Sequence, residues 1–205
     1  EPHRIARLIK HVREDQVGQY FLTTHSPIVL RELTIKELHI VHNNAGVVQI
    51  IAASDKNLEE HEVQGKIRSS AEAFLAKKVV VCEGATEVGF LRGFDDYQLS
   101  KGKNPFSYHG VALLNVGGAS KIKGMAQAFN SLCYSVAVLA DGDDPKQFSE
   151  NDEAALKEAG ADILVWADKL SLEERAMMDL PWDSVMISVR LASEELGYPV
   201  RDNVC

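Results

Sequence analysis

The sequence has few cysteines and no long apolar run, which argues against a disulfide-stabilised protein and against a membrane-spanning one. No stretch approaches the length that a membrane-spanning helix needs, and the first residues do not form a signal peptide. The three cysteines, Cys82, Cys133 and Cys205, are far apart and form neither a zinc spacing nor a disulfide framework. We therefore expect a cytoplasmic protein without membrane contact, in which Cys82 and Cys133 are small core residues.

The sequence also lacks the positive charge that is usual for proteins that bind DNA by electrostatic attraction alone. Its net charge is −8, and its hydrophobic share of 45% is ordinary for a globular protein. Any contact with nucleic acid must therefore depend on local lysines and on metal ions that neutralise carboxylates. The chain opens without a methionine, inside a helical pattern, and we expect it to be a fragment of a longer protein.

The first third of the sequence mixes β and helical patterns. Residues 20–24 form a short β-prone run, and Pro27 suits the first turn of a following helix. Two β-rich runs, 38–41 and 47–51, predict a hairpin. Residues 54–65 are polar and acidic, and they predict a surface linker.

From residue 66 onward, predicted strands and helices alternate. The strands are predicted at 77–82, 111–116, 136–140 and 163–166. The helices are predicted at 83–94, 121–132, 152–159, 171–178 and 182–196. This alternation predicts an α/β fold with a parallel sheet flanked by helices.

Two acidic clusters directly follow two of these strands. Glu83 and Glu87 come after the apolar run 79–82, and Asp141 and Asp143 come after 136–140. Ligands of open α/β sheets bind at the carboxyl ends of strands. Four carboxylates together suit a hard cation, Mg²⁺ or Mn²⁺, which can activate water and stabilise the leaving oxygen of a phosphodiester. Solvated or helix-capping acids explain either cluster alone, but the placement of both after strands favours a metal site.

The two clusters resemble the motifs of TOPRIM domains. Val-Val-Val-Cys-Glu-Gly-Ala-Thr-Glu at 79–87 is similar to the glutamate motif of that family. Leu-Ala-Asp-Gly-Asp at 139–143 is similar to its Asp-x-Asp motif. TOPRIM domains occur in topoisomerases, primases, recombination mediators and nucleases of the OLD (overcoming lysogenization defect) family.

The resemblance implies a role for each acidic residue. Glu83 would be a metal ligand or an acid–base group, and Asp141 and Asp143 would be metal ligands, so these three are the predicted catalytic residues. Glu87 would be a further ligand, as in the nuclease branch. Asn115 stands where some members carry an acid, and we leave it out of the predicted site.

The N-terminal third resembles another family. Phe-Leu-Thr-Thr-His-Ser-Pro at 21–27 is similar to the switch-histidine segment of ABC-type ATPases, which implies that His25 senses ATP in the longer protein. No phosphate-loop motif occurs in the sequence, so this chain alone should not hold ATP well. An ATPase tail followed by a TOPRIM domain resembles OLD nucleases, and we place the boundary between 1–72 and 73–205, with the TOPRIM domain truncated at its C-terminus.

The resemblance implies an ATP-regulated DNA endonuclease that uses two Mg²⁺ or Mn²⁺ ions, in phage defence or in repair. In the longer protein it implies a homodimer formed through the ATPase heads, and a helicase as a further partner. Two alternatives remain open, a non-catalytic TOPRIM module that binds DNA or protein, and a topoisomerase.

Outside the acidic clusters, two lysines and two tryptophans bear on DNA binding. Lys121 and Lys123 follow Gly117-Gly118 near a helix start, where phosphate is favoured, and they are candidate contacts to the DNA backbone. Solvated surface lysines explain them equally well. We expect Trp166 and Trp182 in the core rather than as platforms for base stacking.

Overall fold

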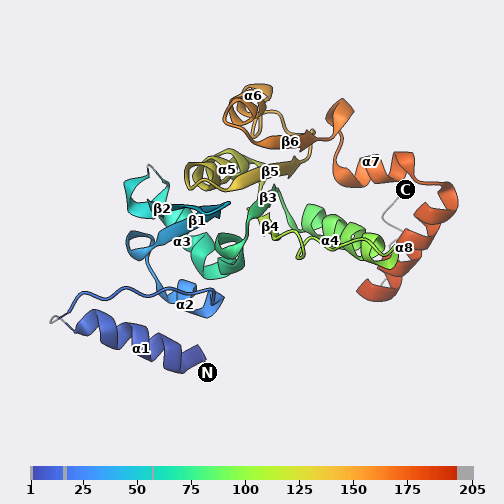
Figure 1. Ribbon diagram of the computed structural model, residues 1–205. Coiled ribbons are helices and arrows are strands. Elements are labelled where there is room, and N and C mark those ends of the chain that lie inside the picture. Colours follow the sequence, from blue (N-terminus) through green and yellow to red (C-terminus); the bar gives the residue numbers. More distant parts are fainter. Residues whose placement is uncertain (1, 16–17, 57, 198–205) are drawn as a thin grey trace. The chain divides into compact units, whose positions relative to one another are not determined.

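The computed structural model describes residues 2–15, 18–56 and 58–197 (Figure 1). The chain divides into two compact units. The first comprises residues up to 140 together with 144–165, and the second comprises 141–143 and the residues from 166 onward. Within the described ranges, no helix is both long and apolar enough to cross a membrane.

A parallel sheet forms the centre of the first unit. Its four strands lie in the order β4-β3-β5-β6 (Figure 1). Their bounds are Lys78–Cys82 for β3, Val111–Asn115 for β4, Ser135–Ala140 for β5 and Asp162–Val165 for β6. Cys82 pairs with Asn115 on one side and with Leu139 on the other. Because Val79 and Val81 are fully buried, β3 has the continuous apolar character of a central parallel strand, and the predicted α/β fold is confirmed.

Three helices connect the strands of this sheet, and they are α4 (Ala85–Ser100), α5 (Ile122–Ser131) and α6 (Glu150–Glu158). The step from β3 to β4 runs in the opposite direction to the next two steps. Right-handed crossovers therefore place α5 and α6 on one face and α4 on the other, as Figure 1 shows. Ile122, Met125, Ala126 and Phe129 recur at helical spacing on α5 and are buried against the sheet.

The N-terminal part of the first unit consists of short elements. The helices are α1 (Pro2–Glu14), α2 (Pro27–Glu32) and α3 (Glu60–Ser69), and the hairpin strands are β1 (His39–Asn44) and β2 (Val47–Ala52). Short 3₁₀ helices occur in this part at η1 (Ile35–Glu37), η2 (Ala53–Asp55) and η3 (Ala71–Leu75), and a further one, η4 (Ala119–Lys121), lies between β4 and α5. Pro27 begins α2 as predicted. The predicted hairpin is confirmed, and its two turn residues, Ala45 and Gly46, both have the positive φ that tight hairpin turns require.

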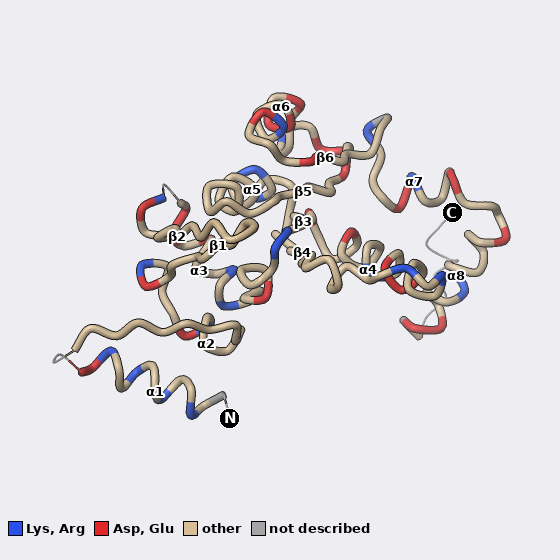
Figure 2. Tube along the Cα trace, viewed as in Figure 1, with Lys and Arg blue, Asp and Glu red and all other residues tan. Residues whose placement is uncertain are grey.

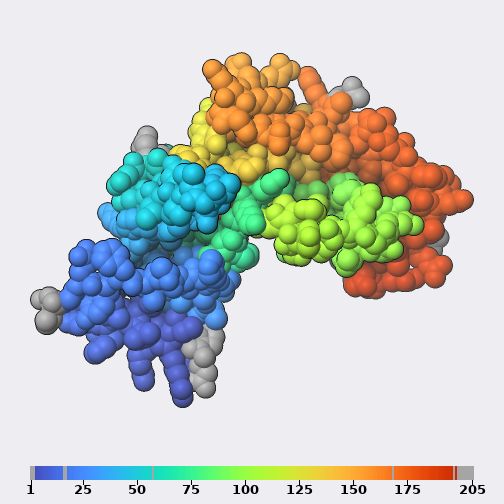
Figure 3. All heavy atoms as spheres, in the orientation of Figure 1, coloured from blue at the N-terminus to red at the C-terminus, as the bar shows by residue number. Residues whose placement is uncertain are grey.

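The hairpin buries one face and exposes the other. Ile40 and Ile51 are paired across the strands and lie in the core. Val41, Val48 and Ile50 point the other way and are exposed, and the hairpin forms a continuous part of the surface in Figure 3 (cyan). The alternation follows directly from the two-residue period of a strand.

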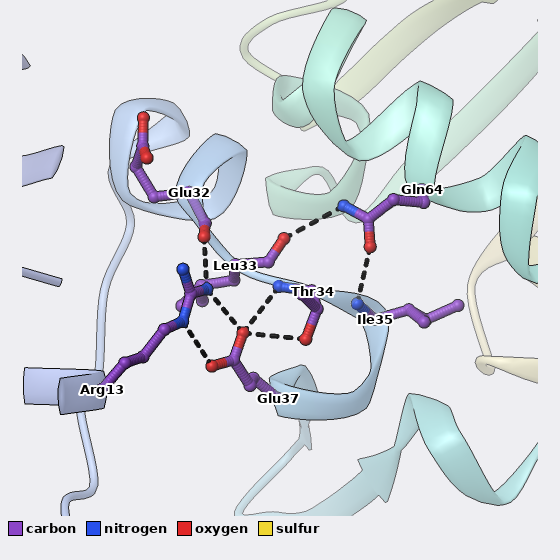
Figure 4. A network of polar contacts seen from close by, with 7 residues as sticks. All are labelled: Arg13, Glu32, Leu33, Thr34, Ile35, Glu37 and Gln64. Carbon is purple, nitrogen blue, oxygen red and sulfur yellow. Dashed lines mark hydrogen bonds and ion pairs between the residues drawn. The ribbon is translucent and has the colours of Figure 1, made fainter. Parts of the chain in front are cut away.

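Arg13 links α1 to the rest of the first unit (Figure 4). Its guanidinium donates to both carboxylate oxygens of Glu37, at 2.7 and 2.6 Å, and to the carbonyl oxygen of Glu32. Glu37 also accepts from the N–H and the hydroxyl of Thr34, both at 2.8 Å. The Arg13 guanidinium lowers the pKa of Glu37 to about 2. Figure 2 shows further basic residues along α1.

Two predicted segments differ in the structure. Residues 20–24 form no strand, and Phe21 is 88% exposed, because among the described residues no strand pairs with this run. Residues 54–65 are not a plain linker, because α3 begins at Glu60. Val63 and Ile67, four residues apart, anchor α3 in the core, while polar residues cover its outer sides and conceal the helical pattern.

Two expected core residues are exposed. Cys133 follows α5 in a left-handed conformation, with φ of 62°, and lies at the surface. Trp182 begins α8 (Trp182–Leu196) and is 73% exposed. Cys82 is buried as predicted, and Trp166 is partly buried.

Candidate metal centre

Glu83 is the first residue after β3, at the carboxyl end of the sheet. Its N–H donates to the carbonyl oxygen of Leu139 on β5, at 3.3 Å. Its carbonyl oxygen accepts from the N–H groups of Gly117 and Gly118, at 3.0 and 2.9 Å, just beyond β4. Both glycines have positive φ, which side chains disfavour. The backbone of Glu83 is therefore fixed between the ends of two neighbouring strands, and its side chain is half-buried.

Glu87 lies in the first turn of α4 and is only 3% exposed. One of its carboxylate oxygens accepts from the N–H of Gly84 at 2.6 Å, which satisfies a backbone donor at the helix start. Burial, and secondarily the charge of Glu87, raises the pKa of the Cys82 thiol to about 12. Glu87 thus caps α4, and a carboxylate with two oxygens can do so while binding a cation through its other lone pairs.

Asp141 and Asp143 belong to the second unit. Asp141 follows β5 directly, and its carboxylate accepts from the N–H of Leu172 at 2.9 Å, at the start of α7 (Leu172–Asp179). Gly142 donates its N–H to the carbonyl oxygen of Leu170 at 3.1 Å. Asp143 is exposed. The loop 141–143 is therefore bound to the segment that leads into α7.

Gly142 has no room for a side chain. A Cβ atom at this position would lie 2.3 Å from the backbone oxygen of Trp166 and 3.4 Å from the Cα of Lys169. Because Trp166 lies just before η5 (Ala167–Lys169), the glycine lets this backbone pass close to the motif. A glycine is thus required sterically between the two aspartates.

The two acidic clusters follow β3 and β5, which pair with each other in the sheet. Leu139, which accepts the N–H of Glu83, precedes Asp141 by two residues. Over the residues that the structure describes, no three His, Cys, Asp or Glu side chains are gathered closely enough to hold a metal ion. The donor set of Glu83, Glu87, Asp141 and Asp143 is all-oxygen, which fits Mg²⁺ or Mn²⁺. Their assembly into one site stays a prediction.

The two predicted DNA-binding lysines have different surroundings. Lys121 ends η4 and is exposed, and its Nζ lies 3.9 Å from the point where a Cβ on Gly117 would be. Lys123 forms an ion pair with Asp152 at 2.7 Å, and this bond lowers the pKa of Asp152 to about 2. The charge of Lys123 is therefore already neutralised by a neighbour.

Lys66, which the sequence analysis missed, lies at the same end of the sheet. Its Nζ donates to the carbonyl oxygen of Asn115, the last residue of β4, at 2.6 Å. Burial, and then the nearby charge of Lys121, lowers the pKa of Lys66. No sequence pattern could have revealed this contact, because Lys66 and Asn115 are separated by 49 positions and are joined only by the fold.

His25 is exposed and directly precedes the Ser26 that caps α2. The N–H of Ser26 donates to the hydroxyl of Thr24 at 2.9 Å, which shapes the turn into α2. The ATP-sensing role of His25 stays a prediction.

The parallel sheet, with a glutamate after β3 and an Asp-x-Asp sequence after β5, is consistent with a TOPRIM fold. The family model that describes the TOPRIM domain of overcoming lysogenization defect protein-like proteins matches residues 74–143. The match begins within η3 and ends at Asp143, so it includes all four candidate ligands. Residues 74–143 are therefore similar to the TOPRIM domain of OLD-like proteins. Among curated proteins, none matches this chain.

Proposed function

We propose that this protein acts as a metal-dependent DNA endonuclease of the OLD kind. The observation that carries the proposal is the position of Glu83, held by backbone hydrogen bonds between the ends of β4 and β5, within the region that matches OLD-like TOPRIM domains. Asp141 directly follows β5, at the carboxyl end of that strand. Carboxyl ends of parallel strands are where such sheets bind ligands.

Glu83, Glu87, Asp141 and Asp143 would hold one or two Mg²⁺ or Mn²⁺ ions. When bound, the ions supply charge stabilisation to the attacking and leaving oxygens of the phosphodiester. In this proposal Asp141 and Asp143 would bind the metal from the loop that directly follows β5. Glu83 would bind a metal ion at the carboxyl end of the sheet, or it would accept the proton of the attacking water. Glu87 supports the site from the α4 terminus.

The proposal also extends to ATP and to protein partners. His25 would respond to ATP bound by an ATPase head, and the heads would pair in a homodimer. A helicase would be a further partner, and the biological setting would be phage defence or DNA repair in the cytoplasm. The resemblance of residues 21–27 to the switch-histidine segment supports the role of His25, and the other roles follow from the resemblance to OLD nucleases.

The test is nicking of supercoiled plasmid in Mg²⁺, in Mn²⁺ and in excess EDTA. We expect cleavage only with metal, and we expect Asp141→Asn and Glu83→Gln each to reduce it about 100-fold or more, because each removes a charge that positions the metal. Asparagine keeps the oxygen that accepts from Leu172, so the fold of the loop should persist. Matched thermal unfolding would confirm this.

Asp162→Asn serves as the control. Asp162 is an exposed carboxylate on the first residue of β6, at the amino end of the same sheet, and its loss should leave nicking unchanged. Equal nicking by the wild type and Asp141→Asn would mean that the acids are structural. The second candidate, a non-catalytic TOPRIM module, would then apply. It is favoured by the backbone N–H bonds that Glu87 and Asp141 already accept.

A further inference from the structure

Lys66 reaches the carboxyl end of the sheet from α3. Its ammonium group donates to the carbonyl oxygen of Asn115 at 2.6 Å. Asn115 pairs with Cys82, the residue before Glu83. An ammonium group has three N–H donors, so this single bond anchors Lys66 while its other donors can bind a ligand.

Lys121 approaches the same place from η4. Its Nζ lies close to Gly117, and Gly117 and Gly118 donate their N–H groups to the carbonyl oxygen of Glu83. Burial is the main cause of the lowered pKa of Lys66, and the nearby charge of Lys121 lowers it further. Two cations are thus held near each other at the end of β4, beside the backbone of Glu83.

Two like charges repel, and an arrangement that keeps them together is stabilised by an anion between them. We propose that Lys66 and Lys121, the lysine pair, bind a phosphate of the DNA backbone next to the candidate metal centre. This inference rests on the proposed function, because it takes DNA as the ligand. The pair would position the strand so that a neighbouring phosphodiester meets Glu83.

The charges around the lysine pair support an anion site. Glu62, one turn before Lys66 on α3, is an acidic group whose charge raises the pKa of Lys66 and so partly offsets the effect of burial. Lys66 and Lys121 bring two ammonium groups to the end of β4 in a chain whose overall charge is −8. Lys123, only two residues after Lys121, is instead paired with Asp152. We therefore choose Lys66 and Lys121, rather than Lys121 and Lys123, as the pair that would bind phosphate.

The experiment measures binding of a short fluorescein-labelled DNA duplex to the 205-residue chain by anisotropy. Ca²⁺ is present as a hard cation for the carboxylates, and NaCl is varied. Lys121→Met should weaken binding roughly three- to tenfold at low salt and reduce the slope of log K against log salt by about 1. Lys66→Met should behave similarly, whereas Lys66→Arg, which keeps the charge, should stay within about twofold of the wild type.

Lys123→Met is the matched control, because it removes a lysine of the same segment that is already neutralised. It should leave the affinity and the salt slope unchanged. Equal weakening by Lys121→Met and Lys123→Met would overturn the inference, as would absence of DNA binding by the wild type. Because Lys121 is exposed, its variant should fold even if Lys66→Met does not.

The result that would refute the proposed function differs from the result that would refute the lysine pair. A wild-type chain that binds DNA through the lysine pair but does not nick plasmid in Mg²⁺ or Mn²⁺ would support the pair and refute the nuclease. An RNA duplex of the same length that competes better than the DNA would overturn the assignment of DNA as the ligand.

Discussion

Gly142 separates the two aspartates of the Asp-x-Asp sequence, and its missing side chain leaves space for the backbone oxygen of Trp166. We expect Gly142→Ala to destabilise the second unit by about 1–3 kcal/mol, because the new methyl group would meet backbone rather than a flexible side chain. It should also weaken the bond from Leu172 to Asp141 and reduce nicking. Urea unfolding and the plasmid assay would measure both effects.

Gly89→Ala is the control for this substitution. Gly89 lies within α4, and a Cβ there would meet nothing within 4 Å. Alanine is the better helix former, so this variant should be as stable as the wild type or more stable by about 0.5–1 kcal/mol. A Gly142→Ala protein that unfolds at the wild-type urea concentration would contradict the steric argument.

The residue roles show where sequence patterns stop being informative. The order of acids after two strands predicted Glu83, Glu87, Asp141 and Asp143 as candidates. It could not show that Glu87 caps α4 through the N–H of Gly84, because a capping acid and a ligand acid look alike in sequence. The ion pair that neutralises Lys123 involves Asp152, which lies in another helix, and only the fold brings the two together.

At the scale of elements, α1 depends on the ion pair between Arg13 and Glu37. We expect Glu37→Gln to increase amide hydrogen exchange in α1 while the sheet stays protected, because the loss is local. The side chains are more than a third exposed, so the effect should be within about 1 kcal/mol. Glu14→Gln, which removes a more exposed pair with Lys10, should change the exchange much less.

The same ion pair predicts a pH dependence. The pKa of Glu37 is about 2 in the folded chain and 4.5 ordinarily. A lowered pKa means that the pair stabilises α1 fully above about pH 4.5 and loses this contribution as the pH falls through about 2. Exchange in α1, corrected for its intrinsic rate, should therefore rise in that window in the wild type. In Glu37→Gln no such rise should occur; an identical rise would exclude the pair as its cause.

Elements with a strong pattern were predictable from sequence, and those with a mixed pattern were not. β3 and β5 contain uninterrupted apolar runs and are directly followed by Glu83 and Asp141, so their position in a parallel sheet followed directly. α3 was missed, because only Val63 and Ile67 mark its buried side. The run 20–24 has strand propensity, but propensity does not supply a pairing partner.

At the scale of the whole molecule, we expect no ATP hydrolysis by this 205-residue chain. The physical reason is that its sequence contains no phosphate-loop motif to cradle the phosphates of a nucleotide. Release of phosphate from ATP should equal that of a protein-free blank, with and without DNA. Turnover that disappears in His25→Ala would show that this interpretation of the N-terminal part is wrong.

The burial of Cys82 has a consequence for how the protein withstands oxidants. A cysteine reacts as its thiolate, and a pKa of about 12 leaves essentially no thiolate at neutral pH. Cys133, by contrast, lies at the surface, where peroxides and alkylating agents can reach it. Of the two cysteines that the structure describes, Cys133 would therefore be damaged first, while Cys82 at the end of β3 keeps its sulfur intact. A dye attached to Cys133 could report on the chain without touching the candidate metal centre.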